Sequence, residues 1–70
     1  MNVIINGEPR EFPEPFLALL TLVTEKLGMK GDRVAVELNR QIVRREAWES
    51  TLVNDGDRLE IVHFVGGGKS

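Results

Sequence analysis

Short apolar runs separated by polar turn residues dominate the chain, and the clearest is residues 34–38, where Val34, Val36 and Leu38 alternate with Ala35 and Glu37. A period of two is typical of a β-strand with one face on a core. Similar runs at residues 2–6, 42–43 and 59–65 also predict strands. The last run is apolar on both faces, as central strands often are.

Turn residues punctuate these strands. Asn6-Gly7 is a strong signal for a two-residue hairpin, because both residues tolerate positive φ, and the chain is expected to return through residues 10–12. Further turns are predicted at residues 39–41 and 54–57, which are rich in Asn, Asp, Gly or other polar residues.

One stretch shows helical periodicity instead. Its apolar residues recur at spacings of three and four: Phe16, Leu20, Val23 and Leu27. This spacing predicts a helix over residues 16–27, with Pro15 in the first turn and Gly28 ending it. Lys26, in the last turn, is expected to complement the helix dipole. Residues 44–50 are predicted to form one helical turn that carries Trp48, more often a core plug than a binding residue.

This order of elements predicts an α+β fold. A single main helix must cover one mixed sheet of four to five strands, since no other segment is long enough to form a second layer. If the last strand is central, it pairs with the first strand, and the arrangement is a β-grasp, or ubiquitin-like, fold. Residues 1–65 are the expected folded domain.

The last strand also suggests a surface for partners. Leu59 and Ile61 should face the helix, which places Val62 and Phe64 on the uncovered face. With His63 and Val65 they form the predicted docking surface. The alternative is that a loop or the strand-pair segment around residues 34–43 covers Val62 and Phe64. The cluster Arg40, Arg44 and Arg45 is either solvated surface or a contact for an acidic partner.

The chain then runs into three glycines, Gly66, Gly67 and Gly68, followed by Lys69 and Ser70. Glycine has no Cβ, so residues 66–70 are expected to be a flexible tail. Six residues from Val65 onward can span roughly 20 Å, at about 3.3 Å each. Such a tail could enter the active site of another protein, which suggests chemistry performed on the chain's own C-terminus.

Composition argues against several other functional classes, namely nucleic-acid-binding, metal-binding and membrane-spanning proteins. Seventy residues make one domain, and the net charge of −2 argues against nucleic acid as a partner. No cysteine and a single histidine make a metal site improbable. The lack of cysteine suits a reducing, cytoplasmic setting. The longest apolar run, residues 16–23, is too short for a membrane span, which needs about 20 residues.

Several motifs, in order, resemble the ThiS family of sulfur carriers in thiamine biosynthesis, over nearly the whole chain. They are residues 34–39, Ile42-Val43, Arg45 with Trp48, residues 55–57 leading into 59–62, and residues 63–67. The resemblance implies a carrier with no bound cofactor, which is not itself an enzyme. A ThiF-type enzyme would use ATP to adenylate its terminal glycine carboxylate. A sulfur donor enzyme would supply the sulfur, and the resulting thiocarboxylate would pass it to a ThiG-type thiazole synthase.

The chain departs from this family after Gly68, because such carriers are expected to end at glycine. Either Lys69 and Ser70 are removed before activation, or the chain is not a working carrier, or the two residues were added to the natural sequence. Removal would make Gly68 the acceptor. Two other interpretations stay open: a carrier resembling the small subunit of molybdopterin synthase, and a ubiquitin-like interaction module without carrier chemistry.

Overall fold

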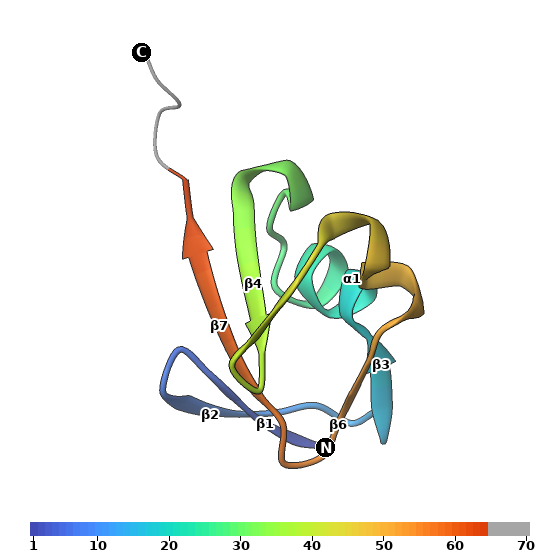
Figure 1. Cartoon of the computed structure of the whole chain (residues 1–70). Helices are drawn as coiled ribbons and strands as arrows, with labels where there is room; N and C mark the ends of the chain where they lie inside the picture. Colours follow the sequence, from blue (N-terminus) through green and yellow to red (C-terminus); the bar gives the residue numbers. More distant parts are fainter. Residues whose placement is uncertain (65–70) are drawn as a thin grey trace.

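The computed structural model describes residues 1–64, whose strands form two sheets (Figure 1). The larger sheet has five strands in the order β2-β1-β7-β4-β5, and the smaller pairs β3 with β6. The strands of the larger sheet are β1 (Asn2–Ile5), β2 (Glu8–Glu11), β4 (Val34–Leu38), β5 (Gln41–Val43) and β7 (Arg58–His63). Those of the smaller are β3 (Phe16–Ala18) and β6 (Leu52–Asn54).

The central position predicted for the last strand is confirmed. β7 runs parallel to β1 and antiparallel to β4, while β1–β2 and β4–β5 are antiparallel hairpins. The sheet is therefore mixed, with one main helical segment against one of its faces (Figure 1). This is the expected α+β, β-grasp arrangement.

The main helix begins later than predicted. It starts at α1 (Leu19–Thr21) and continues directly into the wider turns of η1 (Leu22–Lys26), so residues 16–18 lie outside it. In η1 the Leu27 N–H donates to the Leu22 carbonyl at 3.0 Å, five residues back. Gly28 then takes a positive φ of 68°, which ends the helix as expected.

The prediction of a helix from Phe16 was wrong because this segment pairs with a distant one. Phe16–Ala18 forms β3, antiparallel to β6, and the Leu19 N–H donates to the Thr51 carbonyl at 2.7 Å. Backbone pairing across more than thirty residues of sequence holds Ala18 in an extended conformation and delays the helix. Local spacing carries no sign of this contact.

Two asparagines at hairpin turns bind the central strand. Asn6 and Asn39 both have φ of 51°, an angle that asparagine tolerates better than most residues. The Asn6 side chain accepts from the Ile61 N–H at 2.7 Å and donates to the Ile61 carbonyl at 3.2 Å, so it extends the ladder beyond β1. On the other side of β7, the Asn39 side chain accepts from the Arg58 N–H at 2.9 Å.

The core lies between the five-stranded sheet and the helix. Its buried members are Val3, Ile5, Phe12, Leu19, Leu22, Val23, Val34, Val36, Trp48, Val53, Leu59 and Ile61. Trp48, on η3 (Arg45–Ser50), is fully buried, and its indole N–H donates to the Val43 carbonyl at 2.9 Å. The prediction that Trp48 is a core plug is therefore confirmed.

Candidate functional site

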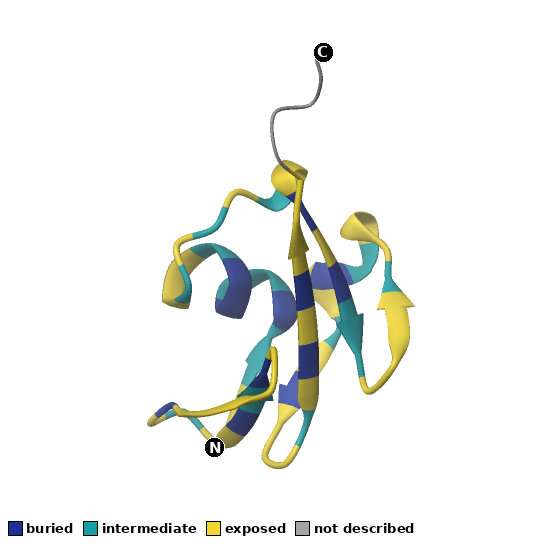
Figure 2. Ribbon diagram, turned by 90° about the vertical axis from the view of Figure 1, so that its left-hand side faces the viewer, coloured by how far each residue is buried: buried dark blue, intermediate teal, exposed yellow. Residues whose placement is uncertain are grey.

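The two faces of β7 have opposite environments. Leu59 and Ile61 are buried beneath the helix, and the intervening residues are exposed, which gives the strand its banded colouring in Figure 2. Val62 is 59% exposed and Phe64, just past the strand, is 55% exposed. The predicted exposure of both residues is confirmed, and the alternative of a covering loop is wrong for the described residues. Their role in docking stays a prediction.

Phe64 is anchored through its backbone although its ring is exposed. Its N–H donates to the Arg33 carbonyl at 2.8 Å, next to η2 (Gly31–Arg33). The last paired residues of β4 and β7 are Val34 and His63, so this hydrogen bond extends the pairing by one residue. The His63 side chain is exposed. The sheet thus holds the backbone up to Phe64, the last residue that the structure describes. The other predicted site residues, Val65 and Gly66, Gly67 and Gly68, lie outside the described residues.

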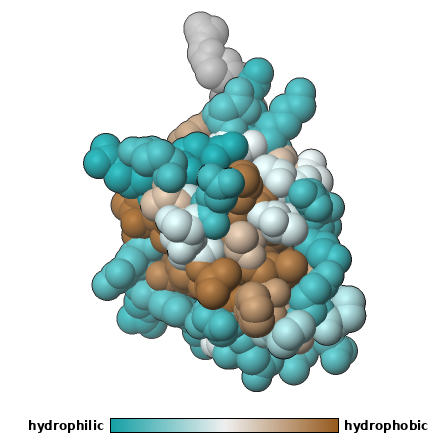
Figure 3. Space-filling view, turned by 90° about the vertical axis from the view of Figure 1, so that its right-hand side faces the viewer, coloured by the Kyte–Doolittle hydropathy of each residue, from teal (hydrophilic) through white to brown (hydrophobic). Residues whose placement is uncertain are grey.

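A second apolar area lies elsewhere on the surface, and no local pattern predicts it. Figure 3 shows apolar side chains gathered on the side of the molecule where β3 and β6 lie. Phe16 and Leu52, on these two strands, are 52% and 51% exposed. Phe16 was expected to face the core from a helix; its place in β3 turns it outward instead.

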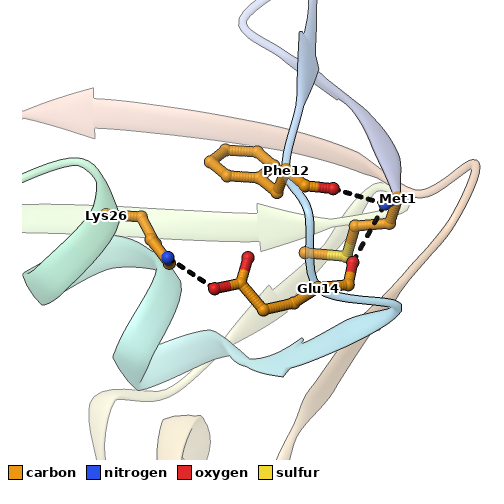
Figure 4. A network of polar contacts seen from close by, with 4 residues as sticks. All are labelled: Met1, Phe12, Glu14 and Lys26. Atoms are coloured by element: carbon orange, nitrogen blue, oxygen red, sulfur yellow. Dashed lines mark hydrogen bonds and ion pairs between the residues drawn. The ribbon is translucent and has the colours of Figure 1, made fainter.

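The charged groups near the N-terminus hold the fold together (Figure 4). The Met1 ammonium group donates to the carbonyl oxygens of Phe12 and Glu14 at 2.6 and 2.9 Å. The Glu14 carboxylate pairs with the Lys26 ammonium group at 2.5 Å. The hydrogen bond from Lys26 holds the pKa of Glu14 below its ordinary value. Lys26 therefore links the end of the helix to the segment before β3. This contact is additional to the expected interaction of Lys26 with the helix dipole.

The three arginines expected to cluster have different surroundings. Arg40 lies in the β4–β5 turn with a positive φ of 72°. Arg44 approaches Glu46 at 3.7 Å, with both side chains exposed. The Arg45 guanidinium lies 5.0 Å from the centre of the Trp48 ring and against Gly31, where an added Cβ would meet its Nε at 2.5 Å. Arg45 thus packs against Trp48 while its side chain stays exposed, as are Arg40 and Arg44, and a role of the three in docking stays a prediction.

Residues 1–64 offer no enclosed site. They contain no pocket and no group of three or more potential metal-ligating side chains. Nor does any of their helices have the length and apolar character to cross a membrane. The candidate site is therefore the exposed side of β7, together with the segment that follows it.

Comparison with known proteins identifies a family with this architecture. A model of the ThiS family matches residues 3–68. The crystal structure of a thiamine biosynthesis protein (ThiS) from Geobacter metallireducens is 36% identical and superposes with a TM-score of 0.83, covering 97% of this chain and 100% of that one.

Two named relatives add detail. The sulfur carrier protein ThiS of Escherichia coli is 36% identical over 44 residues, which are 63% of this chain and 67% of that protein. A thiazole synthase of Paramagnetospirillum magneticum is 46% identical over 68 residues, which are 97% of this chain. The chain spans only 20% of the length of that synthase.

Proposed function

The chain belongs to the ThiS family of sulfur carrier proteins of thiamine biosynthesis, and we propose that it carries sulfur as a thiocarboxylate on its glycine segment. The observation that carries this proposal is the family match, which continues beyond the residues that the structure describes and ends at Gly68. We take residues 1–65 as the docking body and residues 66–70 as the segment presented to enzymes. Gly68 is the proposed acceptor, so Lys69 and Ser70 must be removed before activation.

The chemistry requires little from the carrier itself. A carboxylate is a poor acylating group, and transfer of AMP from ATP, with loss of pyrophosphate, gives it a good leaving group. A sulfur nucleophile then attacks the acyl carbon and AMP departs. The carrier must supply an unhindered terminal carbonyl, for which glycine is suited, while the partner enzymes supply the catalytic groups.

The proposed docking surface is the exposed end of β7. Val62 and Phe64 supply apolar area next to the glycine segment, and His63 and Val65 complete the surface. Apolar side chains with this exposure are candidates for an interface when they lie together. The Phe64 backbone contact with Arg33 supports this placement, because it holds Phe64, the last described residue, against the β4 side of the sheet.

We propose three enzyme partners, all acting in the cytoplasm. They are a ThiF-type adenylating enzyme, a sulfur donor enzyme and a ThiG-type thiazole synthase that receives the sulfur. The relative named thiazole synthase supports the last of these. It contains a segment similar to nearly all of this chain within a protein about five times longer.

The test compares a chain ending at Gly68 with one ending at Ser70. Each is incubated with a ThiF-type enzyme, ATP and a sulfur source, and intact masses are measured. Only the chain ending at Gly68 should gain the mass expected for replacing a carboxylate oxygen by sulfur. Conversion of the longer chain on Ser70 would show that removal is unnecessary. If neither chain reacts where an established carrier is converted, the carrier proposal is wrong.

A further inference from the structure

The open face of the five-stranded sheet carries more than the end of β7. Residues directly opposite each other on paired strands project to the same side of a sheet. Val36 and Ile61 are such a pair on the buried side. The neighbouring pairs, Ala35 with Val62 and Glu37 with Glu60, therefore project from the opposite side, which the helix leaves open.

Glu37 and Glu60 form the centre of this open face. They stand directly opposite each other on the neighbouring strands β4 and β7, where like charges are unfavourable. The ion pairs of the described residues join Lys26 to Glu14 and Arg44 to Glu46, so neither central carboxylate takes part in one within residues 1–64. Within residues 1–64 the opposed carboxylates therefore have no ion-pair partner, although Arg58 lies two residues before Glu60 on the same side of β7.

Exposed apolar side chains lie on both sides of the two carboxylates. Ile42, on the edge strand β5, is paired with Glu37 and is 75% exposed. Val62 lies two residues beyond Glu60 on β7, so the face continues into the surface proposed above for docking. An apolar contact with two carboxylates at its centre is complementary to a surface that places a cation between apolar groups.

We propose that the adenylating enzyme docks on this face and inserts a basic side chain between Glu37 and Glu60. This inference rests on the carrier function proposed above. Arginine suits the position best, because its planar guanidinium donates several hydrogen bonds at once to carboxylate oxygens. Docking then neutralises the carboxylate pair, so binding relieves a repulsion present in the free carrier.

A second copy of this chain is a poorer occupant of the same face. A symmetric contact centred on the pair would bring four carboxylates together, because a two-fold interface apposes the same patch from each subunit. Like charges across an interface disfavour association. The charge arrangement therefore favours a basic partner over self-association.

The experiment measures binding and stability in the same variants. Glu37→Gln and Glu60→Gln are compared with the full chain and with Glu25→Gln, which makes the same charge change at an exposed position of η1. Affinity for the ThiF-type enzyme is measured by calorimetry at low and high salt, and stability by urea unfolding. Each open-face variant should lose affinity by about tenfold at low salt, with less loss at high salt. Each should unfold at the same or a higher urea concentration than the unchanged chain.

This opposite movement of binding and stability separates docking from a structural role. Unchanged affinity in both open-face variants, or an equal loss in Glu25→Gln, would overturn the proposal. So would lower stability of both open-face variants, or sedimentation showing a dimer that these variants disrupt. Conversion of the chain ending at Gly68 to the thiocarboxylate is measured alongside. If conversion occurs and the carboxylates prove irrelevant, this inference alone fails; if the chain neither binds nor reacts, the carrier function fails with it.

Discussion

The buried and open sides of β7 differ in what their residues contribute, although they alternate along one strand. Leu59 and Ile61 pack beneath the helix with the rest of the core. Glu60 and Val62 face outward, and Glu60 stands opposite another carboxylate. The buried side contributes apolar side chains to the core. The open side carries exposed apolar and acidic side chains that are not part of the core. Along β7, core residues thus alternate with the residues that we propose for partner recognition.

The largest effect is expected from a comparison of adjacent residues on β7. Ile61→Ala should lower the free energy of unfolding by about 2–5 kcal/mol, because it removes a buried side chain and leaves a cavity. Val62→Ala should change it by no more than about 0.5 kcal/mol. Urea unfolding followed by fluorescence of the single, buried Trp48 measures both. Similar losses of unfolding free energy in the two variants would show that the buried and open sides of β7 contribute equally to stability.

The second prediction concerns two phenylalanines of nearly equal exposure on different surfaces. Phe64→Ala should weaken binding to the ThiF-type enzyme by about 2 kcal/mol or more, since aromatic residues often dominate interfaces. Phe16→Ala, on β3, is the matched control and should leave that affinity unchanged. Calorimetry gives the affinities, and urea unfolding checks that the Phe64 variant keeps its fold. A larger loss of affinity from Phe16→Ala would move the docking surface to the β3–β6 side.

The third prediction tests how β7 is held within the plane of the sheet. Asn6→Ala should cost about 2 kcal/mol, because it removes two hydrogen bonds to Ile61 and because alanine tolerates the positive φ of this position less well than asparagine. Asn6→Gly keeps the backbone angle and loses only the amide, so it should cost less. Unfolding measurements on both variants separate the contribution of the amide hydrogen bonds from that of the backbone angle. If Asn6→Gly is as stable as the unchanged chain, the amide does not support the strand.

The smallest effect concerns Glu14, whose carboxylate is paired with the Lys26 ammonium group. Its pKa is lowered, first by the hydrogen bond from Lys26, so the charged form stabilises the folded state. This contribution is complete above the ordinary pKa of 4.5 and is lost as the pH falls through the lowered value. Glu14→Gln should therefore be less stable than the unchanged chain at about pH 7, and the difference should shrink near about pH 3. A difference that does not vary with pH would show that the ion pair contributes nothing.

Much of the architecture follows from local sequence. Alternation at Val34, Val36 and Leu38 identified a strand with one buried face, and Asn6-Gly7 identified a hairpin, because period and turn chemistry act over a few residues. Apolarity on both sides of residues 59–65 indicated the central strand. It also indicated the open side, since alternate residues must project oppositely. The family resemblance supplied the chemistry of the glycine segment, which no periodicity could.

Only the tertiary structure decided where the helix begins and what surrounds the exposed residues. Phe16 and Leu20 have helical spacing, yet Phe16–Ala18 is a strand because its backbone hydrogen bonds go to Leu52–Asn54. The Glu37–Glu60 pair likewise exists only through the register of β4 against β7. Both depend on segments far apart in the chain. Local pattern indicates which elements a segment can form, whereas pairing partners and opposed charges are set only when distant strands meet in one register.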